Sequence, residues 1–318
     1  MKQYSALCCY FGAWPSYFQV WLNSCSYNVG IDFYLVTDIS VAGYHVPCNV
    51  HIVKMSFAEV QQLVKSKFPD LKISLNTSYK LCDFKTAYGY IFADIFRNYS
   101  YWGFLDIDTI WGDIVSFIPH NEDNHLIKIF PCGHLCFIRN KAPYNKVFEL
   151  VNQVANMSCR NNMIGKQVVT WQECFSSSNN YYYDEEGGLE PLFTCNSMLS
   201  ELSYQQVDFD NIMPPWRFDH FTSINFPQKC FLVYNYNCGK LERIYLNKMH
   251  ICREQVSYVH LSKRQILVRT DDFKHFSLVP NKIITSKKWN IFMLLICGRP
   301  RYIYNFIGRA IAKVKRLI

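Results

Sequence analysis

The sequence predicts an α/β protein with a central, mostly parallel sheet. Short apolar segments of strand length, residues 4–12 and 31–38, flank a segment with helical spacing, and this alternation is typical of parallel sheets. Half of the 318 residues are hydrophobic and 17% are aromatic, so the chain can bury a large core. We therefore expect one catalytic-size domain, residues 1–280, followed by a basic tail, residues 281–318.

The first elements follow one another in a regular order. The first helix is expected in the segment that begins at Pro15, where apolar residues recur at helical spacing. A third strand, residues 49–53, precedes a second helix, whose start is marked by the capping-box pair Ser56 and Glu59. The order strand, helix, strand thus continues beyond the first unit.

The next strand ends in two aspartates. An amphipathic helix over residues 84–96 is expected first, with Asp83 able to cap it, and it leads into the apolar strand 101–106. Alternate side chains of an extended strand point to the same face, so Asp106 and Asp108 can reach one point in space. Ligands of open α/β sheets bind outside the carboxyl ends of the strands, and we expect a ligand site there.

The second half of the chain has a less regular pattern. Apolar segments at 126–130 and 135–138 are followed by a helical stretch from about residue 144. No repeat, low-complexity tract or clear linker is recognisable before about residue 275. This pattern favours one domain with a tail.

The cysteines and the N-terminus predict a cytoplasmic location. Fourteen cysteines are scattered singly or side by side, and none forms the C-x-x-C spacing of a zinc site, so we expect reduced thiols. The first residues lack the apolar region and cleavage site of a signal peptide. No run approaches the roughly 18 apolar residues of a membrane span.

The net charge of +8 comes from the tail. Residues 281–318 contain nine of the 33 lysines and arginines and no acidic residue, whereas the rest of the chain is close to neutral. A protein that reads nucleic acid would spread its positive charge over a folded face, so this distribution argues against nucleic acid as a partner.

The tail is expected to associate with a membrane surface. Residues 301–318 have apolar side chains on one helical face and basic side chains on another, and the apolar run 289–297 before them is too short to span a bilayer. Anionic lipids attract lysine and arginine by about 1 kcal/mol each. The alternative is a packing helix with a solvated basic face.

The paired aspartates indicate a metal-bound phosphate ligand. Mg²⁺ and Mn²⁺ prefer carboxylate oxygens and usually bridge to phosphates. A D-x-D alone is a weak signal, and the chain contains a second copy, Asp208 and Asp210, in a polar stretch without an apolar strand before it. We expect that second copy to be solvated surface, and the same explanation stays open for Asp106 and Asp108.

Five segments, in this order, suggest a family: "SYKLCDFKTAYGYIF", "YWGFLDIDTIWGDI", "GHLCFIRN", "YDEEGG" and "YVHLSKRQ". Together they resemble the bacterial glycosyltransferases that build capsule, O-antigen and exopolysaccharide chains. The resemblance covers residues 4 to about 265. It implies a single domain of the glycosyltransferase-A (GT-A) fold, which is Rossmann-like and binds nucleotide sugars.

The resemblance also implies a set of metal ligands. Asp106 and Asp108 match the family's metal-binding D-x-D, and His260 matches a late histidine that looks like a third ligand for Mn²⁺ or Mg²⁺. Lys263 would lie near the diphosphate of the donor. A lone histidine is more often packed or exposed than bound to metal, and that alternative stays open for His260.

Further residues would hold the sugar nucleotide. The ends of the first two strands correspond to the binding places of base and ribose: Phe11, Gly12, Thr37 and Asp38. Two later motifs match the donor-site segment and the sugar pocket: Lys80, Asp83, Lys85, Gly133 and His134. The alternatives are a helix cap for Asp83, solvated lysines, and a core or turn role for the last two.

The acceptor hydroxyl needs a base, and Asp184 or Glu185 matches the family's acidic pair for this role, although a solvated acidic loop is the alternative. The implied reaction is inverting transfer of a sugar, with galactose or galactofuranose favoured, from a UDP-sugar to a lipid-linked acceptor at the inner face of the cell membrane.

Two other classes of protein remain as alternatives. A haloacid-dehalogenase-like phosphotransferase would need Thr or Val at position 110, where Ile110 stands, and a non-catalytic, membrane-associated assembly protein would bind no nucleotide.

Overall fold

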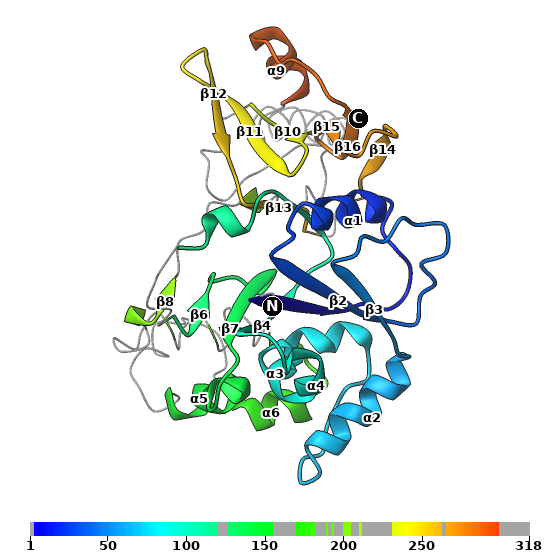
Figure 1. Ribbon diagram of the computed structural model, residues 1–318, viewed down its shortest axis with the longest axis vertical. Helices are drawn as coiled ribbons and strands as arrows, with labels where there is room; N and C mark the ends of the chain where they lie inside the picture. The colour runs from blue at the N-terminus through cyan, green and yellow to red at the C-terminus, as the bar shows by residue number, and fades with distance from the viewer. Residues whose placement is uncertain are drawn as a thin grey trace, which may run out of the picture.

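The computed structural model describes residues 3–119, 126–154, 170–181, 200–204, 231–262 and 265–298, together with residues 189, 193, 210 and 211. In these residues the chain forms three sheets, of seven, six and three strands, with helices packed against them (Figure 1). The predicted α/β class is confirmed. The expectation of one central sheet is not confirmed, because the strands after residue 231 form a sheet of their own.

The seven-stranded sheet has the order β3-β2-β1-β4-β7-β6-β8. Its strands are β1 (Tyr4–Cys9), β2 (Ile31–Thr37), β3 (Val50–Lys54), β4 (Tyr101–Leu105), β6 (Lys128–Ile129), β7 (Leu135–Arg139) and β8 (Ser203–Tyr204). The first four strands are parallel, and β7 runs antiparallel to β4. The chain builds outward from β1 to β2 and β3 on one side and returns to place β4 on the other, so the topological switch point lies between β1 and β4.

Helices cover both faces of this sheet (Figure 1). The face toward the six-stranded sheet is covered by α1 (Phe18–Ser26), whose Trp21 packs against Phe33 of β2. The opposite face is covered by α2 (Phe57–Lys67), the 3₁₀ helix η1 (Ser78–Ala87), α3 (Tyr88–Ile91), α4 (Ala93–Phe96), η3 (Tyr144–Lys146), α5 (Val147–Val154) and α6 (Trp171–Ser176). The predicted capping box at Ser56 and Glu59 is confirmed.

The continuous helix expected over residues 84–96 is wrong. The chain instead forms η1, which begins before Asp83, and then the two short helices α3 and α4. Asp83 caps no helix, because its carboxylate is buried and accepts hydrogen bonds from Lys80 and from the backbone of Tyr181. A local ion pair with Lys80 and a long-range contact with Tyr181 have replaced the capping interaction that the sequence suggested.

The six-stranded sheet has the order β12-β11-β10-β15-β16-β14. Its strands are β10 (Leu232–Asn237), β11 (Lys240–Asn247), β12 (His250–Gln255), β14 (Leu267–Arg269), β15 (His275–Val279) and β16 (Lys282–Thr285). One face packs on α1 through Tyr17 and Val20, and the other is covered by α9 (Ile291–Cys297). Within the described residues, no helix is both long and apolar enough to cross a bilayer.

The three-stranded sheet joins the two larger ones. It consists of β5 (Thr109–Trp111), β13 (Tyr258–His260) and β9 (Asp210–Asn211), and the short η2 (Val115–Phe117) follows β5. Because β5 comes directly after β4 and β13 after β12, this small sheet brings the end of one large sheet to the other.

The domain boundary expected after residue 280 falls in the turn between two paired strands. β15 and β16 form an antiparallel hairpin, so Lys282–Thr285, assigned by sequence to the tail, is a strand of the six-stranded sheet. Trp289 and Leu294 are buried against the same sheet. The amphipathic helix expected over residues 301–318 lies outside the described residues.

Candidate metal and nucleotide site

A cavity of about 540 Å³ opens at the switch point of the seven-stranded sheet. Tyr10 and Phe11, which follow β1, line one side of it, and Asp106 and Asp108, which follow β4, line another. His260 at the end of β13 completes the polar part of the wall. The fold thus places the cavity where the topology of an α/β sheet leaves room for a ligand.

Asp106, Asp108 and His260 converge at the edge of this cavity. Antiparallel pairing of β5 with β13 sets Thr109 opposite His260, and Leu261 N donates to the backbone oxygen of Asp108 at 2.6 Å. One carboxylate oxygen of each aspartate and one ring nitrogen of the histidine all lie within 4.8 Å of one another. Nε2 of His260 is 3.3 Å from Oδ1 of Asp108.

These three side chains fit a divalent cation. Ligands at about 2.1 to 2.5 Å from one ion lie at most about 4 to 5 Å apart, which is the range of the observed cluster. Two carboxylates suit Mn²⁺ or Mg²⁺, since both ions favour oxygen ligands, and the imidazole, a softer ligand, makes Mn²⁺ the better fit of the two. The structure therefore brings together the three residues expected as ligands, although the first and the last of them are 154 positions apart in the sequence.

Lys85 supplies the positive charge nearest to the aspartates in the described part of the cavity wall. Its Nζ lies 2.8 Å from Oδ1 of Asp106 and donates to the backbone oxygen of Gly133 at 2.9 Å. The residue is buried, so water screens this ion pair little. Lys85 thereby ties the D-x-D turn to the "GHLCFIRN" segment and fixes the Asp106 carboxylate.

His134 lies directly behind the cluster. Its backbone oxygen accepts from Asp106 N at 3.2 Å, and its ring stacks on the ring of His260 with centroids 4.2 Å apart and planes 20° apart. Burial, followed by the nearby His260 and Lys85, holds the pKa of His134 well below its usual value, so the ring is neutral at pH 7. Gly133 and His134 are not among the described residues that line the cavity. They instead contact residues that do line it, through the hydrogen bonds from Lys85 and Asp106 and the stacking on His260.

The remaining wall of the cavity is aromatic and thiol-rich. Cys8, Cys9 and Cys82 line it together with Tyr17 and Tyr88. Burial raises the pKa of Cys9 to about 12, and burial raises the pKa of Cys8 well above its usual value, so both thiols stay protonated. Since the thiolate is the reactive form of cysteine, these two residues are poor nucleophiles. No spacing in the sequence marks these residues as neighbours of the aspartates.

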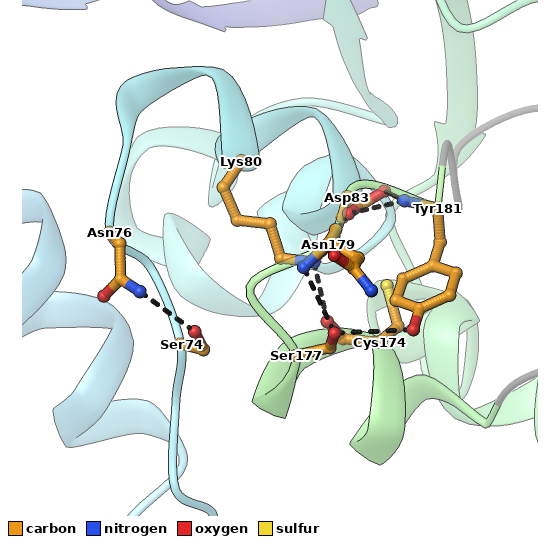
Figure 2. A network of polar contacts seen from close by, with 8 residues as sticks. All are labelled: Ser74, Asn76, Lys80, Asp83, Cys174, Ser177, Asn179 and Tyr181. Carbon is orange, nitrogen blue, oxygen red and sulfur yellow. Dashed lines mark hydrogen bonds and ion pairs between the residues drawn. The ribbon is translucent and has the colours of Figure 1, made fainter.

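Lys80 and Asp83 do not reach the cavity, contrary to the expected donor-site role. They form an ion pair of 2.7 Å in which Lys80 is 2% and Asp83 0% exposed. Figure 2 shows this pair bound to α6 and to the segment after it: Lys80 donates to the backbone oxygens of Cys174 and Asn179, and Tyr181 N donates to both carboxylate oxygens of Asp83. The pair holds η1 and the segment 174–181 together.

The expected base and ribose residues are only partly brought together. Phe11 lines the cavity, whereas Gly12, Thr37 and Asp38 are not among its described lining residues. Gly12 has a φ of +112°, a backbone conformation that favours glycine, so it turns the chain away after β1. The hydroxyl of Thr37 accepts from Ile39 N within its own turn.

Several predicted residues lie outside the described residues: Asp184, Glu185, Lys263 and Asp208. Asp210 of the second D-x-D nevertheless lies beside β13. β9 pairs in parallel with β13, so that Asp210 is in register with Val259 and Asn211 with His260. The sequence placed this stretch on a solvated surface because no apolar strand precedes it.

The family model described as "Family of unknown function (DUF6625)" matches residues 6–287, and the chain belongs to this family. No curated protein matches the chain. Among solved structures, the chain is similar to a glycosyltransferase involved in the glycosylation of the major capsid of the virus PBCV-1, at 14% identity over 51% of this chain and 71% of that one, with a TM-score of 0.28. A similarity at this level carries no inference about fold or activity.

Proposed function

We propose that this member of a family of unknown function is a metal-dependent glycosyltransferase that uses a nucleotide sugar. The observation that carries the proposal is the convergence of Asp106, Asp108 and His260 beside a cavity at the switch point between β1 and β4. Oxygen-rich metal sites of this kind commonly bind a cation together with the phosphates of a substrate. The motif resemblance independently favours a sugar nucleotide over other phosphate ligands.

Each polar residue of the site has a role in this proposal. A divalent cation, Mn²⁺ or Mg²⁺, would be held by Asp106, Asp108 and His260. When bound, this cation would offset negative charge on the departing nucleoside diphosphate. Lys85 orients Asp106 and adds a positive charge beside the phosphates. His134 fixes the ring plane of His260 by stacking. Aromatic and thiol side chains of the wall exclude water from the donor.

The finer assignments rest on the resemblance alone. They are UDP-galactose or UDP-galactofuranose as donor, a lipid-linked acceptor in bacterial surface polysaccharide synthesis, and an inverting mechanism. Asp184 or Glu185 would accept the proton of the acceptor hydroxyl, and Lys263 would lie near the diphosphate. A cytoplasmic enzyme held at the membrane by its basic tail would meet such an acceptor.

A screen of nucleotide sugars with Mn²⁺ tests the proposal. We expect one donor to be hydrolysed slowly, with release of nucleoside diphosphate, even without an acceptor. Asp108→Asn and His260→Ala should lower this rate by at least about 100-fold, because each removes a metal ligand. The matched control is Asp113→Asn, an exposed aspartate five residues after Asp108.

Two experimental results would contradict the proposal, and each would favour a different function. Phosphate release from simple esters, abolished by Asp106→Asn while all nucleotide sugars stay intact, would identify a phosphotransferase. Calorimetry that detects no metal-dependent nucleotide binding would indicate a non-catalytic protein.

A further inference from the structure

One end of the molecule carries exposed apolar side chains that the proposed reaction does not use. Helix α9 buries Leu294 against the six-stranded sheet but leaves other large apolar residues of this seven-residue helix exposed: Ile291, Phe292, Leu295 and Ile296. Phe292 is 70% exposed. Contiguous exposed apolar residues mark sites of interaction, whereas single ones are ordinary.

The turn between β11 and β12 extends this surface. Met249 at the turn is 60% exposed. Leu246 and Ile251, on either side of the turn, pack in the same cluster as Leu294 of α9. Figure 1 shows the turn and α9 at the same end of the long axis, opposite to α2. We call Met249, Ile291, Phe292, Leu295 and Ile296 the apolar end surface.

Three lysines adjoin the residues of the apolar end surface in the chain. Lys248 adjoins Met249 in the turn, and Lys287 and Lys288 lie just before α9; all three are exposed. No acidic residue follows Asp272 in the sequence. Apolar side chains beside ammonium groups are the combination that binds the interface of anionic bilayers, where the apolar part enters the boundary of the acyl chains and the amines meet lipid phosphates.

We propose that the apolar end surface inserts into an anionic membrane and is the docking face of the folded protein. A second copy of this chain fits the surface less well, because a two-fold contact would bring the same lysines together. The proposal deepens the expectation that residues 281–318 associate with a membrane: within that segment it assigns the contact to α9, and it adds the β11–β12 turn, which lies outside the segment. It also holds whether or not the protein transfers sugars.

Co-sedimentation of the full chain with vesicles tests the docking face. Wild type should partition onto mixed phosphatidylglycerol and phosphatidylcholine vesicles more strongly than onto phosphatidylcholine alone. Phe292→Glu should lower the partition coefficient roughly tenfold or more, and the milder Ile296→Gln should lower it in the same direction, because burial of an apolar side chain is lost. Lys287→Gln combined with Lys288→Gln should lower it roughly tenfold on anionic vesicles only.

The chain offers matched controls for both kinds of change. Val29 is 71% exposed, as Phe292 is 70%, but it stands in the turn before β2, so Val29→Glu should keep wild-type partition. Lys65 and Lys72 are exposed in and after α2, at the other end, and their double change to Gln should lower partition much less than the Lys287 and Lys288 pair.

Three outcomes would overturn the proposal. Wild-type partition of both Phe292→Glu and Ile296→Gln would assign membrane binding to another segment. Equal loss in Val29→Glu and Phe292→Glu would indicate a nonspecific charge effect. Absence of vesicle binding, with Phe292→Glu turning an oligomer into a monomer in gel filtration, would make the surface a self-association face. Donor hydrolysis without vesicles should be unchanged in all these variants, so failure of the docking proposal is distinguishable from failure of the proposed reaction.

Discussion

At the scale of single residues, Lys85 is placed to balance the charge of the site. Its ammonium group lies 2.8 Å from an oxygen of Asp106, the position from which that carboxylate would also hold a cation. A buried positive charge so close opposes a second positive ion but favours an anionic diphosphate. Removing it should therefore change the affinities for metal and for nucleotide in opposite directions.

We expect Lys85→Met to bind Mn²⁺ alone severalfold more tightly and to bind UDP, in saturating Mn²⁺, about tenfold more weakly. Calorimetry of the two steps measures both values. Lys85→Arg keeps the charge and serves as the control. Equal weakening of both steps would contradict this role, since it would mean that Lys85 only keeps the local fold.

The three expected donor residues of "YKLCDFK" show what a sequence can and cannot specify. The segment is a 3₁₀ helix with three residues per turn, so Lys80 and Asp83 share one face while Lys85 points in another direction. The sequence pattern predicts an α-helix that begins after Asp83, and this prediction does not give the directions in which the three side chains point. Asp106 and Asp108 could be predicted, because their position depends only on the strand before them.

At the scale of elements, the Lys80 and Asp83 pair fastens the segment 174–181 to η1 (Figure 2). Both side chains are almost completely buried. Loss of one partner leaves the other charged and buried without its counter-charge, which costs about 3 to 5 kcal/mol. We expect Lys80→Met to lower the free energy of unfolding by that amount in denaturant titrations.

The exposed pair of Arg97 and Asp94 provides the matched control, with side chains 73% and 85% exposed. Arg97→Met should cost less than about 1 kcal/mol, because water screens such a pair. Adding Asp83→Leu to Lys80→Met should recover part of the lost stability, since it removes the buried charge that has lost its counter-charge. If Lys80→Met were no more destabilising than Arg97→Met, the pair would not be a fastening point.

The parallel half of the large sheet could be predicted, whereas the six-stranded sheet could not. Residues 4–67 contain their own signals: apolar runs of strand length, helical spacing and the Ser56 capping box. Neighbouring strands of the six-stranded sheet are antiparallel except for β14 and β16, which are parallel. Its order includes the pairing of β10 with β15, a contact between segments about 40 residues apart that local pattern does not give. The position of His260 depends on the pairing of β5 with β13, a contact between distant segments, and only the motif resemblance pointed to it.

At the scale of the whole molecule, the metal cluster depends on both large sheets. Asp106 and Asp108 follow the seven-stranded sheet, while His260 follows β12 of the six-stranded sheet. The six-stranded sheet is in turn completed by residues that the sequence assigned to the tail. Trp289 is buried on its outer face and donates from Nε1 to Oδ1 of Asn235 at 2.7 Å, and Asn235 also accepts from Ser277 at 2.6 Å.

A chain that ends after residue 280 should therefore lose stability and the metal site together. It lacks β16, which exposes the edge of β15, and it lacks Trp289 and Leu294, whose burial contributes about 5 kcal/mol or more. That loss is comparable to the total stability of many domains, so we expect little folded protein at 37 °C. A chain that ends after Gly298 keeps these contacts, so it should melt at a higher temperature than the shorter chain and should bind Mn²⁺. Melting curves and Mn²⁺ calorimetry compare the two, and an unchanged melting temperature of the shorter chain would restore the boundary at residue 280.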